Sequence, residues 1–258
     1  MAPNSIGCSL KKLDLRDTGL INILPALRNS KDCEVEKLWL RASEEEHVAG
    51  ILKQKKPFCV GRVIKMELGG YAVGVITKMS LEDYGVDKLK LTAPRKKYIT
   101  EILKQEKPFC VGRVKSMWIN DYAVGVITKM SHEGCEVEKL ILTADKEAHV
   151  AAVLEQENPF CLGRVGKVEF EGYAVSVIAK MSIHEDNTIE RFRISANEDH
   201  FSRILGEKDR SIELGRIRLG GFHVPEEVRR KLRYTLVDGY GKEVLEERDS
   251  SKWWRKKW

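Results

Sequence analysis

Cysteine and histidine are the residues of this chain that could ligate a metal or act as nucleophiles, and there are six of each. Cys59, Cys110 and Cys161 lie 51 residues apart in the strings PFCVGR, PFCVGR and PFCLGR, so each is a copy of one repeated position. Cys33 and Cys135 lie 102 residues apart, with Tyr84 at the matching position between them. No C-x-x-C pair occurs, so this spacing does not favour a metal site. We therefore expect the cysteines to be small buried apolar residues.

The histidines follow the same repeat. His47 and His149 are equivalent, and Tyr98 occupies the position between them, which argues against a shared metal site. The chain also has no phosphate-binding loop and no G-x-S-x-G string. These observations predict a protein that is not an enzyme and that uses no cofactor or metal.

The elements that position any binding residue are indicated by an apolar-x-x-apolar-x-apolar triplet, which occurs nine times at steps of 23 to 28 residues. A fixed pattern at a nearly fixed step predicts a solenoid, in which each unit packs only against its neighbours. The triplets are Leu10/Leu13/Leu15, Val35/Leu38/Leu40, Val63/Met66/Leu68, Val86/Leu89/Leu91, Val114/Met117/Ile119, Val137/Leu140/Leu142, Val165/Val168/Phe170, Ile189/Phe192/Ile194 and Leu214/Ile217/Leu219.

Two units form a double repeat of 51 residues. In the long unit, period-two alternation predicts a short strand, and apolar residues at helical spacing (Val150, Val153 and Leu154) predict a helix that Pro159 ends. In the short unit, a strand precedes YAVGVITKM, which we expect to be a short helix. The expected N-caps are Ser43, Asp145 and Asn197.

This pattern resembles the leucine-rich repeat family, whose signature L-x-x-L-x-L is followed by Asn or Cys. The alternating units are most similar to the helix-backed members, such as ribonuclease inhibitors. The resemblance covers roughly residues 10–222. It implies an α/β solenoid with a curved parallel sheet of about nine short strands on the concave face and helices on the convex face.

The chain departs from the family at the position of the buried Asn, where one Asn is found and where three tyrosines alternate with cap residues. We therefore expect a different loop packing. The nine positions hold Thr18, Ser43, Tyr71, Pro94, Tyr122, Asp145, Tyr173, Asn197 and Phe222.

A basic stripe is predicted on the concave face, because eight of the nine residues just before the middle apolar position are basic. These are Lys12, Lys37, Lys65, Lys88, Ser116, Lys139, Lys167, Arg191 and Arg216. In one interpretation the neighbouring acids Glu36, Asp87, Glu138 and Glu190 neutralise the stripe. In the other, the stripe recruits an acidic partner, for which a protein is favoured over nucleic acid because aromatic residues are sparse.

The residues between the last two apolar positions form a second row, in which Trp39, Trp118 and Ile141 replace charged residues. Such residues are candidate interface hot spots, and the alternative is that they pack sideways on lysine stems. The row reads Asp14, Trp39, Glu67, Lys90, Trp118, Ile141, Glu169, Arg193 and Arg218.

At the N-terminal end, the first triplet leaves no room for a polar cap, so we expect Leu13, Leu15, Ile23 and Leu24 to be exposed. In one interpretation the chain is a piece of a longer protein, and in the other another surface covers this end, which would allow self-association. At the other end, Pro225 begins an expected helix, and Asp238–Gly241 is an expected turn. The expected segments are an N-terminal extension (1–9), the repeat array (10–222), a C-terminal helix and cap (223–251) and a basic tail (252–258).

The tail holds four of the six net positive charges, so residues 1–251 carry only +2 (6 − 4). Its Trp253, Trp254, Arg255, Lys256, Lys257 and Trp258 could lie at a membrane interface or stack on bases. No apolar run reaches the roughly 18 residues of a membrane span, and no signal peptide is visible, so we expect a cytoplasmic protein.

Taken together, these patterns predict a non-enzymatic scaffold that binds a protein partner on its concave sheet. The alternative is a nucleic-acid or anionic-membrane binder that uses the lysine stripe and the tail. The predicted partner-binding residues are Trp39, Trp118, Ile141, Lys37, Lys65, Lys88, Lys139, Lys167, Arg191, Arg193, Arg216 and Arg218.

Overall fold

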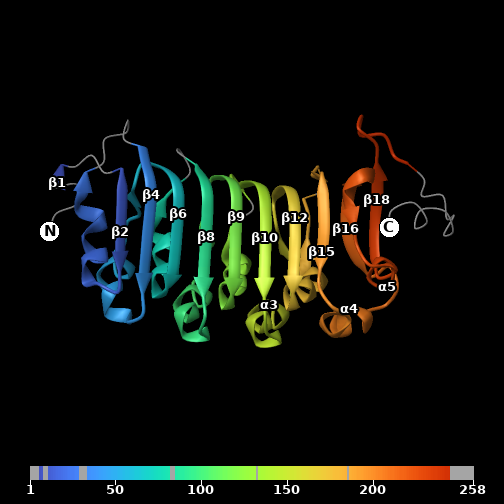
Figure 1. The fold of residues 1–258 in the computed structure, drawn as a ribbon, viewed down its shortest axis with the longest axis horizontal. Helices are drawn as coiled ribbons and strands as arrows, with labels where there is room; N and C mark the ends of the chain where they lie inside the picture. Colours follow the sequence, from blue (N-terminus) through green and yellow to red (C-terminus); the bar gives the residue numbers. More distant parts are fainter. Residues whose placement is uncertain are drawn as a thin grey trace, which may run out of the picture.

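The computed structural model describes residues 6–7, 11–28, 34–81, 85–131, 133–184 and 186–244. Figure 1 shows a row of parallel strands on one side of the molecule, with short helical segments behind and below them. The protein is therefore α/β. We call the sheet surface that faces away from the helical layer the open face.

The main sheet has nine parallel strands, and neighbouring strands follow one another along the chain (Figure 1). In order they are β2 (Lys12–Arg16), β4 (Glu34–Ala42), β6 (Arg62–Gly70), β8 (Val86–Ala93), β9 (Arg113–Asp121), β10 (Glu136–Ala144), β12 (Arg164–Gly172), β15 (Arg191–Ser195) and β17 (Phe222–His223).

Strand register confirms the alignment of the first eight triplets. Leu13 lies opposite Leu38, Leu38 opposite Met66, and the series continues without a slip to Phe192. Leu10 lies outside the described residues. The middle residues from β4 to β15 are all at most 2% exposed, so the triplets do form the core. The core follows because each apolar position repeats opposite itself on the next strand.

The alignment of the ninth triplet is wrong. Ile217 lies opposite Ile189 rather than Phe192, and Phe192 lies opposite Phe222. Leu219, expected in the core, is 50% exposed. Between these two pairings the chain makes an extra 3-10 turn, η9 (Leu219–Gly221), in which a Cβ on Gly221 would stand only 1.8 Å from the Glu190 carbonyl oxygen. Glycine therefore lets the chain turn where the earlier units run straight.

A separate parallel sheet closes the C-terminal end. Its strands are β14 (Thr188–Ile189), β16 (Ile212–Arg218) and β18 (Leu232–Val237). The helix expected to begin at Pro225 is confirmed as α5 (Glu226–Arg229), with Pro225 as its N-cap. The expected turn is confirmed by hydrogen bonds from the Tyr240 and Gly241 N–H groups to Asp238.

The helical layer is built mainly from 3-10 turns. Each long unit has a 3-10 turn followed by one α-helical turn, and each short unit has a single longer 3-10 helix. The long-unit pairs are η2 (Glu45–His47) with α1 (Ala49–Leu52), η4 (Lys96–Tyr98) with α2 (Thr100–Leu103), η6 (Glu147–His149) with α3 (Ala151–Leu154), and η8 (Glu198–Phe201) with α4 (Ser202–Leu205). The short-unit helices are η1 (Gly19–Ala26), η3 (Tyr71–Lys78), η5 (Tyr122–Lys129) and η7 (Tyr173–Lys180).

The expected short helix over YAVGVITKM is thus confirmed, in 3-10 form. Its β-branched residues have low α-helical propensity. Short strand pairs lie beyond these helices: β1 (Ile6–Gly7) with β3 (Leu27–Arg28), β5 (Phe58–Cys59) with β7 (Met79–Ser80), and β11 (Phe160–Cys161) with β13 (Met181–Ser182).

Of the expected N-caps, Asn197 is confirmed, because it forms a reciprocal capping box with His200. Ser43 and Asp145 are not the N-caps, since η2 begins at Glu45 with Glu44 as its N-cap and η6 begins at Glu147 with Lys146 as its N-cap. The Ser43 N–H instead donates to Asp17 Oδ1 at 2.7 Å, which joins two neighbouring units.

The expected alternative to an Asn ladder is confirmed. The tyrosine that begins each of η3, η5 and η7 packs edge-on against the aromatic ring one long unit later. The ring pairs are Tyr71–Tyr98 at 4.8 Å, Tyr122–His149 at 4.7 Å and Tyr173–His200 at 4.4 Å. Aromatic pairs at this distance and angle attract one another beyond simple burial.

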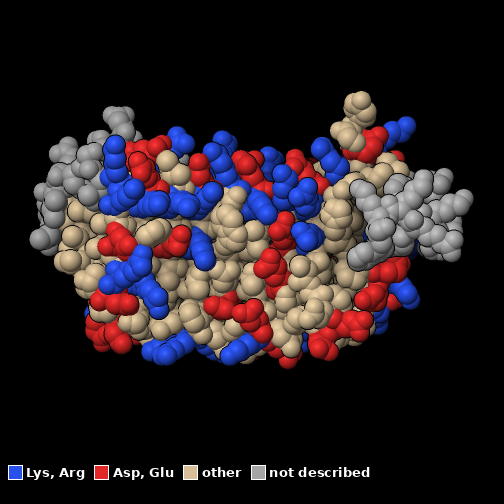
Figure 2. Space-filling view, in the orientation of Figure 1, with Lys and Arg blue, Asp and Glu red and all other residues tan. Residues whose placement is uncertain are grey.

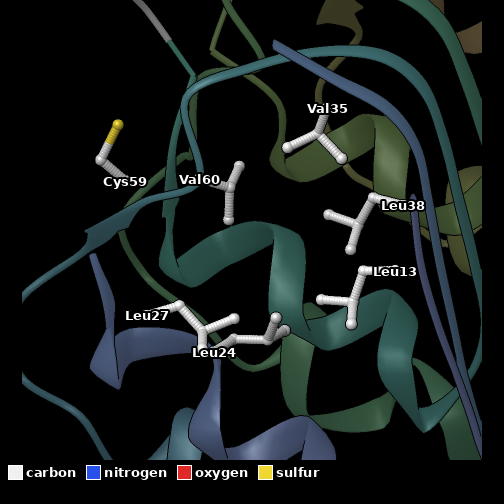
Figure 3. A pocket seen from close by; sticks show the side chains of 7 residues that line it. All are labelled: Leu13, Leu24, Leu27, Val35, Leu38, Cys59 and Val60. Atoms are coloured by element: carbon white, nitrogen blue, oxygen red, sulfur yellow. The ribbon is translucent and has the colours of Figure 1, made fainter. Parts of the chain in front are cut away.

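The N-terminal edge is less exposed than expected. Leu24 is only 2% exposed, and Leu13, Leu15 and Ile23 are half-buried, whereas Leu20 in η1 is 55% exposed. Figure 3 shows Leu24 and Leu27 facing the sheet residue Leu13 across a small apolar cavity of about 20 Å³. The first helical turn and β3 therefore cover part of this edge.

Candidate functional site: the open face of the sheet

The basic stripe exists as an in-register row on eight neighbouring strands. The register places Lys12, Lys37, Lys65, Lys88, Ser116, Lys139, Lys167 and Arg191 opposite one another from β2 to β15. Figure 2 shows the resulting blue band across the sheet. Neighbouring strands lie about 4.8 Å apart, so the row is roughly 35 Å long.

Carboxylates neutralise only part of the row. Lys12 pairs with Glu36 at 3.9 Å, Lys139 with Glu169 at 3.1 Å, and Lys167 with Glu190 at 3.7 Å. Asp87, expected to neutralise the row, instead pairs with Lys115 at 3.1 Å. Charge compensation is therefore uneven along the row.

The uncompensated charge gathers on three adjacent strands. Among the described residues, no carboxylate oxygen lies within 4.0 Å of the ammonium group of Lys37, Lys65, Lys88 or Lys90. We call these four residues, on β4, β6 and β8, the lysine cluster. Arg191, at the far end of the row, likewise has no ion pair within the described part of the chain. Like charges opposite one another on neighbouring strands are destabilising, so the fold itself gains nothing from this arrangement.

The second row carries both signs of charge. Asp14, Trp39, Glu67, Lys90, Trp118, Ile141, Glu169 and Arg193 lie opposite one another in that order. The ninth residue of the row is His223, not Arg218.

Trp39 packs sideways rather than standing free. The Arg16 guanidinium lies 5.1 Å and the Lys37 ammonium 5.3 Å from the centre of its ring, and its Nε1 is buried with no hydrogen-bond partner among the described residues. Cation–π contacts of this kind hold cation and ring together. These contacts match the interpretation in which Trp39 packs sideways on a lysine stem.

Trp118 and Ile141 are direct neighbours on β9 and β10, as expected from the alignment. Ile141 is only 6% exposed although it is on the open face, because Trp118 and the Lys139–Glu169 pair surround it. Trp118 is half-buried and is the accessible member of the pair. Ile141 can thus contribute little area to a contact.

Two predicted site residues lie outside the rows. Arg216 is opposite Thr188 in the C-terminal sheet, and its Nη2 donates to the Gly241 carbonyl oxygen at 2.6 Å. Arg218 lies opposite Val237 in the same sheet. Both were misplaced by the ninth triplet, for the reason given above. The tail residues, including Trp253, Trp254 and Trp258, lie outside the described part of the chain.

The expectation of buried cysteines is only partly confirmed. Cys135 is buried, Cys110 and Cys161 are half-buried, and Cys59 is exposed. The repeat alignment missed a pair: the Cys110 and Cys135 sulfurs lie 2.7 Å apart. The sequence did indicate that these two cysteines are close, because each of them precedes one of two consecutive strands, β9 and β10.

Comparison with known protein families, with curated proteins and with solved structures finds no match for this chain. No helix in the described ranges is long and apolar enough to cross a membrane. Within the same ranges, no group of three or more His, Cys, Asp or Glu side chains is arranged to hold a metal ion.

Proposed function

We propose that this protein is a non-enzymatic binding scaffold, a leucine-rich-repeat-like solenoid that recognises an acidic protein segment on the open face of its sheet. The observation that carries the proposal is the lysine cluster. Its charges lie on adjacent strands without carboxylate partners among the described residues, at a cost in stability that an anionic ligand would offset.

The size of the cluster favours a peptide segment. Lys37, Lys65 and Lys88 span two strand spacings, or about 10 Å. An extended peptide places its same-face side chains about 6.8 Å apart, so two or three carboxylates can contact the cluster together. Trp118, on the next strand, adds an apolar contact of the type found at interface hot spots.

The distribution of acids disfavours nucleic acid. Glu67 lies opposite Lys90 in the second row, and Glu169 and Glu171 lie on β12. A long polyanion that followed the basic row would meet the carboxylates of these residues and of Glu36 and Glu138. A short acidic segment on β4, β6 and β8 does not reach Glu138, Glu169 and Glu171, which lie on β10 and β12.

The proposal of a solenoid rests on the order of the strands and on the nearly constant number of residues between equivalent positions of successive units. Eight consecutive units place equivalent residues in register, and each contacts mainly its neighbours, which is the arrangement of repeat proteins. The edge-on aromatic pairs take the place of the family's Asn ladder.

Binding is tested with a fluorescein-labelled peptide of ten glutamates, measured by fluorescence anisotropy. We expect Lys65→Glu to raise the Kd about 30-fold, because one attraction of about 1 kcal/mol is replaced by a similar repulsion. Lys55→Glu is the matched control, since Lys55 is an exposed lysine in the turn after α1, outside the sheet. It should leave the Kd almost unchanged.

Trp118→Ala is tested with a second peptide that carries a leucine among the glutamates. We expect the substitution to weaken the binding of this peptide more than the binding of the pure glutamate peptide. The urea midpoint of unfolding should stay nearly unchanged. Equal loss of binding in the Lys65→Glu and Lys55→Glu proteins would contradict the proposal. So would tighter binding of oligothymidylate or of phosphatidylserine vesicles than of both peptides at physiological salt.

A further inference from the structure

Cys110 and Cys135 lie unusually close for two thiols. Their sulfur atoms are 2.7 Å apart, shorter than the optimum separation of even two carbon atoms, about 3.5–4.0 Å. Both are present as thiols in the structure. Two sulfurs at this distance need little backbone movement to bond.

The backbone around the pair fixes this approach. The Gly112 N–H donates to Cys110 Sγ at 3.2 Å, and the Glu136 N–H donates to the Gly112 carbonyl oxygen at 3.2 Å. The chain segments that lead into β9 and β10 are therefore held side by side by β-sheet hydrogen bonding. The Gly112 contact therefore fixes the position of the Cys110 sulfur beside the start of β9.

The two sulfurs differ in access. Cys110 is half-buried, whereas Cys135 is 6% exposed. An external reagent therefore reaches Cys110 first. Within the described part of the chain, the sulfur that Cys135 is placed to react with is that of Cys110.

Two other copies of the repeat provide an internal comparison. Cys59 and Cys161 accept the same backbone contact, from Gly61 at 3.3 Å and from Gly163 at 3.4 Å. The positions equivalent to Cys135 in those copies are Tyr84 and Asp186, which cannot form a disulfide. The turn is thus common to three copies, and the second thiol distinguishes the middle one.

We propose that Cys110 and Cys135 form a redox modification site that reacts with a small-molecule disulfide of the glutathione type. Cys110 loses its proton to solvent, and its thiolate attacks one sulfur of the external disulfide and expels one glutathione thiolate. Cys135 then loses its proton and attacks the Cys110 sulfur, which expels the second glutathione. The protein gains one disulfide, and one external disulfide is reduced to two thiols.

The new bond would link the segments that precede β9 and β10, the two strands that carry Trp118 and Ile141. The proposal does not depend on what the open face binds.

The test treats the reduced full-length protein with oxidised glutathione, blocks remaining thiols by alkylation and maps tryptic peptides without reductant. Trypsin places each of the six cysteines on its own peptide, so every pairing can be read separately. We expect a cross-linked product of peptides 105–113 and 130–139 that dithiothreitol removes. Cys59 and Cys161 should carry glutathione adducts instead.

Two variants test the separate roles. Cys135→Ser should trap a glutathione adduct on Cys110, and Cys110→Ser should leave Cys135 modified more than tenfold more slowly than Cys59, in line with burial-controlled thiol access. Circular dichroism of both variants controls for folding. Separate glutathione adducts on Cys110 and Cys135 of the wild-type protein would overturn the proposal, as would predominant pairing of either one with a different cysteine.

Discussion

Removing the charge of a lysine from the basic row should change stability in opposite directions at two positions. Lys65 lies opposite Lys37 and Lys88, and no described carboxylate is within ion-pair distance of it. Lys139 lies in the same row but pairs at 3.1 Å with Glu169, whose side chain is only 14% exposed. Methionine keeps most of the lysine stem, so Lys65→Met and Lys139→Met isolate the effect of charge.

The magnitude follows from the neighbours of each lysine. Lys65→Met removes two like-charge contacts of up to about 1 kcal/mol each and loses a weaker attraction to Glu67 on the same strand. We expect the free energy of unfolding to rise by about 0.5–1 kcal/mol. Lys139→Met leaves the Glu169 carboxylate half-buried without its partner, and we expect a loss of about 1–2 kcal/mol.

Urea unfolding at low salt and at 1 M NaCl measures both effects. The gain from Lys65→Met should shrink at high salt, because the Debye length falls to about 3 Å. Equal destabilisation by Lys65→Met and Lys139→Met would refute this interpretation, as would a gain from Lys65→Met that is the same at both salt concentrations.

Two further predictions concern residues at the ends of the strands that carry the basic row. Gly70 has φ +63°, and a Cβ there would lie 2.2 Å from the Ala42 carbonyl oxygen, so Gly70→Ala should cost about 3 kcal/mol in urea unfolding. Gly19→Ala, with no atom within 4 Å of the new Cβ, should change stability by less than about 0.5 kcal/mol, and equal losses would contradict the argument. Hydrogen bonds from the Ser43 side chain and backbone lower the pKa of Asp17. The ionised carboxylate therefore stabilises the fold above about pH 4 and loses this effect as the pH falls through its lowered pKa. Asp17→Asn should be less stable at pH 7 and lose less stability on acidification than wild type; parallel pH profiles of unfolding would argue against this contribution.

Most of the main sheet and its core could be predicted from the sequence, because equivalent positions of successive units have equivalent neighbours. Leu38, Met66 and Leu89 recur at steps that the register reproduces, and the basic row follows once the triplets are aligned. The ninth unit could not be aligned in this way, because Gly220 and Gly221 allow an additional turn that an apolar pattern does not record.

The site could be predicted only in outline. Periodicity shows which way a side chain points but not what lies beside it, so it did not show that Ile141 is buried or that Asp87 pairs with Lys115. Aligning equivalent positions also hid the Cys110–Cys135 pair, since these two residues hold different positions in consecutive units.

Carbodiimide coupling of the ten-glutamate peptide is the most direct test of the central claim, because it joins a carboxylate to the lysine that it contacts. With the coupled lysines mapped by mass spectrometry, we predict that Lys37, Lys65, Lys88 and Lys90 carry most of the peptide. Lys55 and Lys104, which lie in the helical layer, should carry little. Coupling spread evenly over all exposed lysines, or concentrated outside the sheet, would contradict the assignment of the open face as the binding surface.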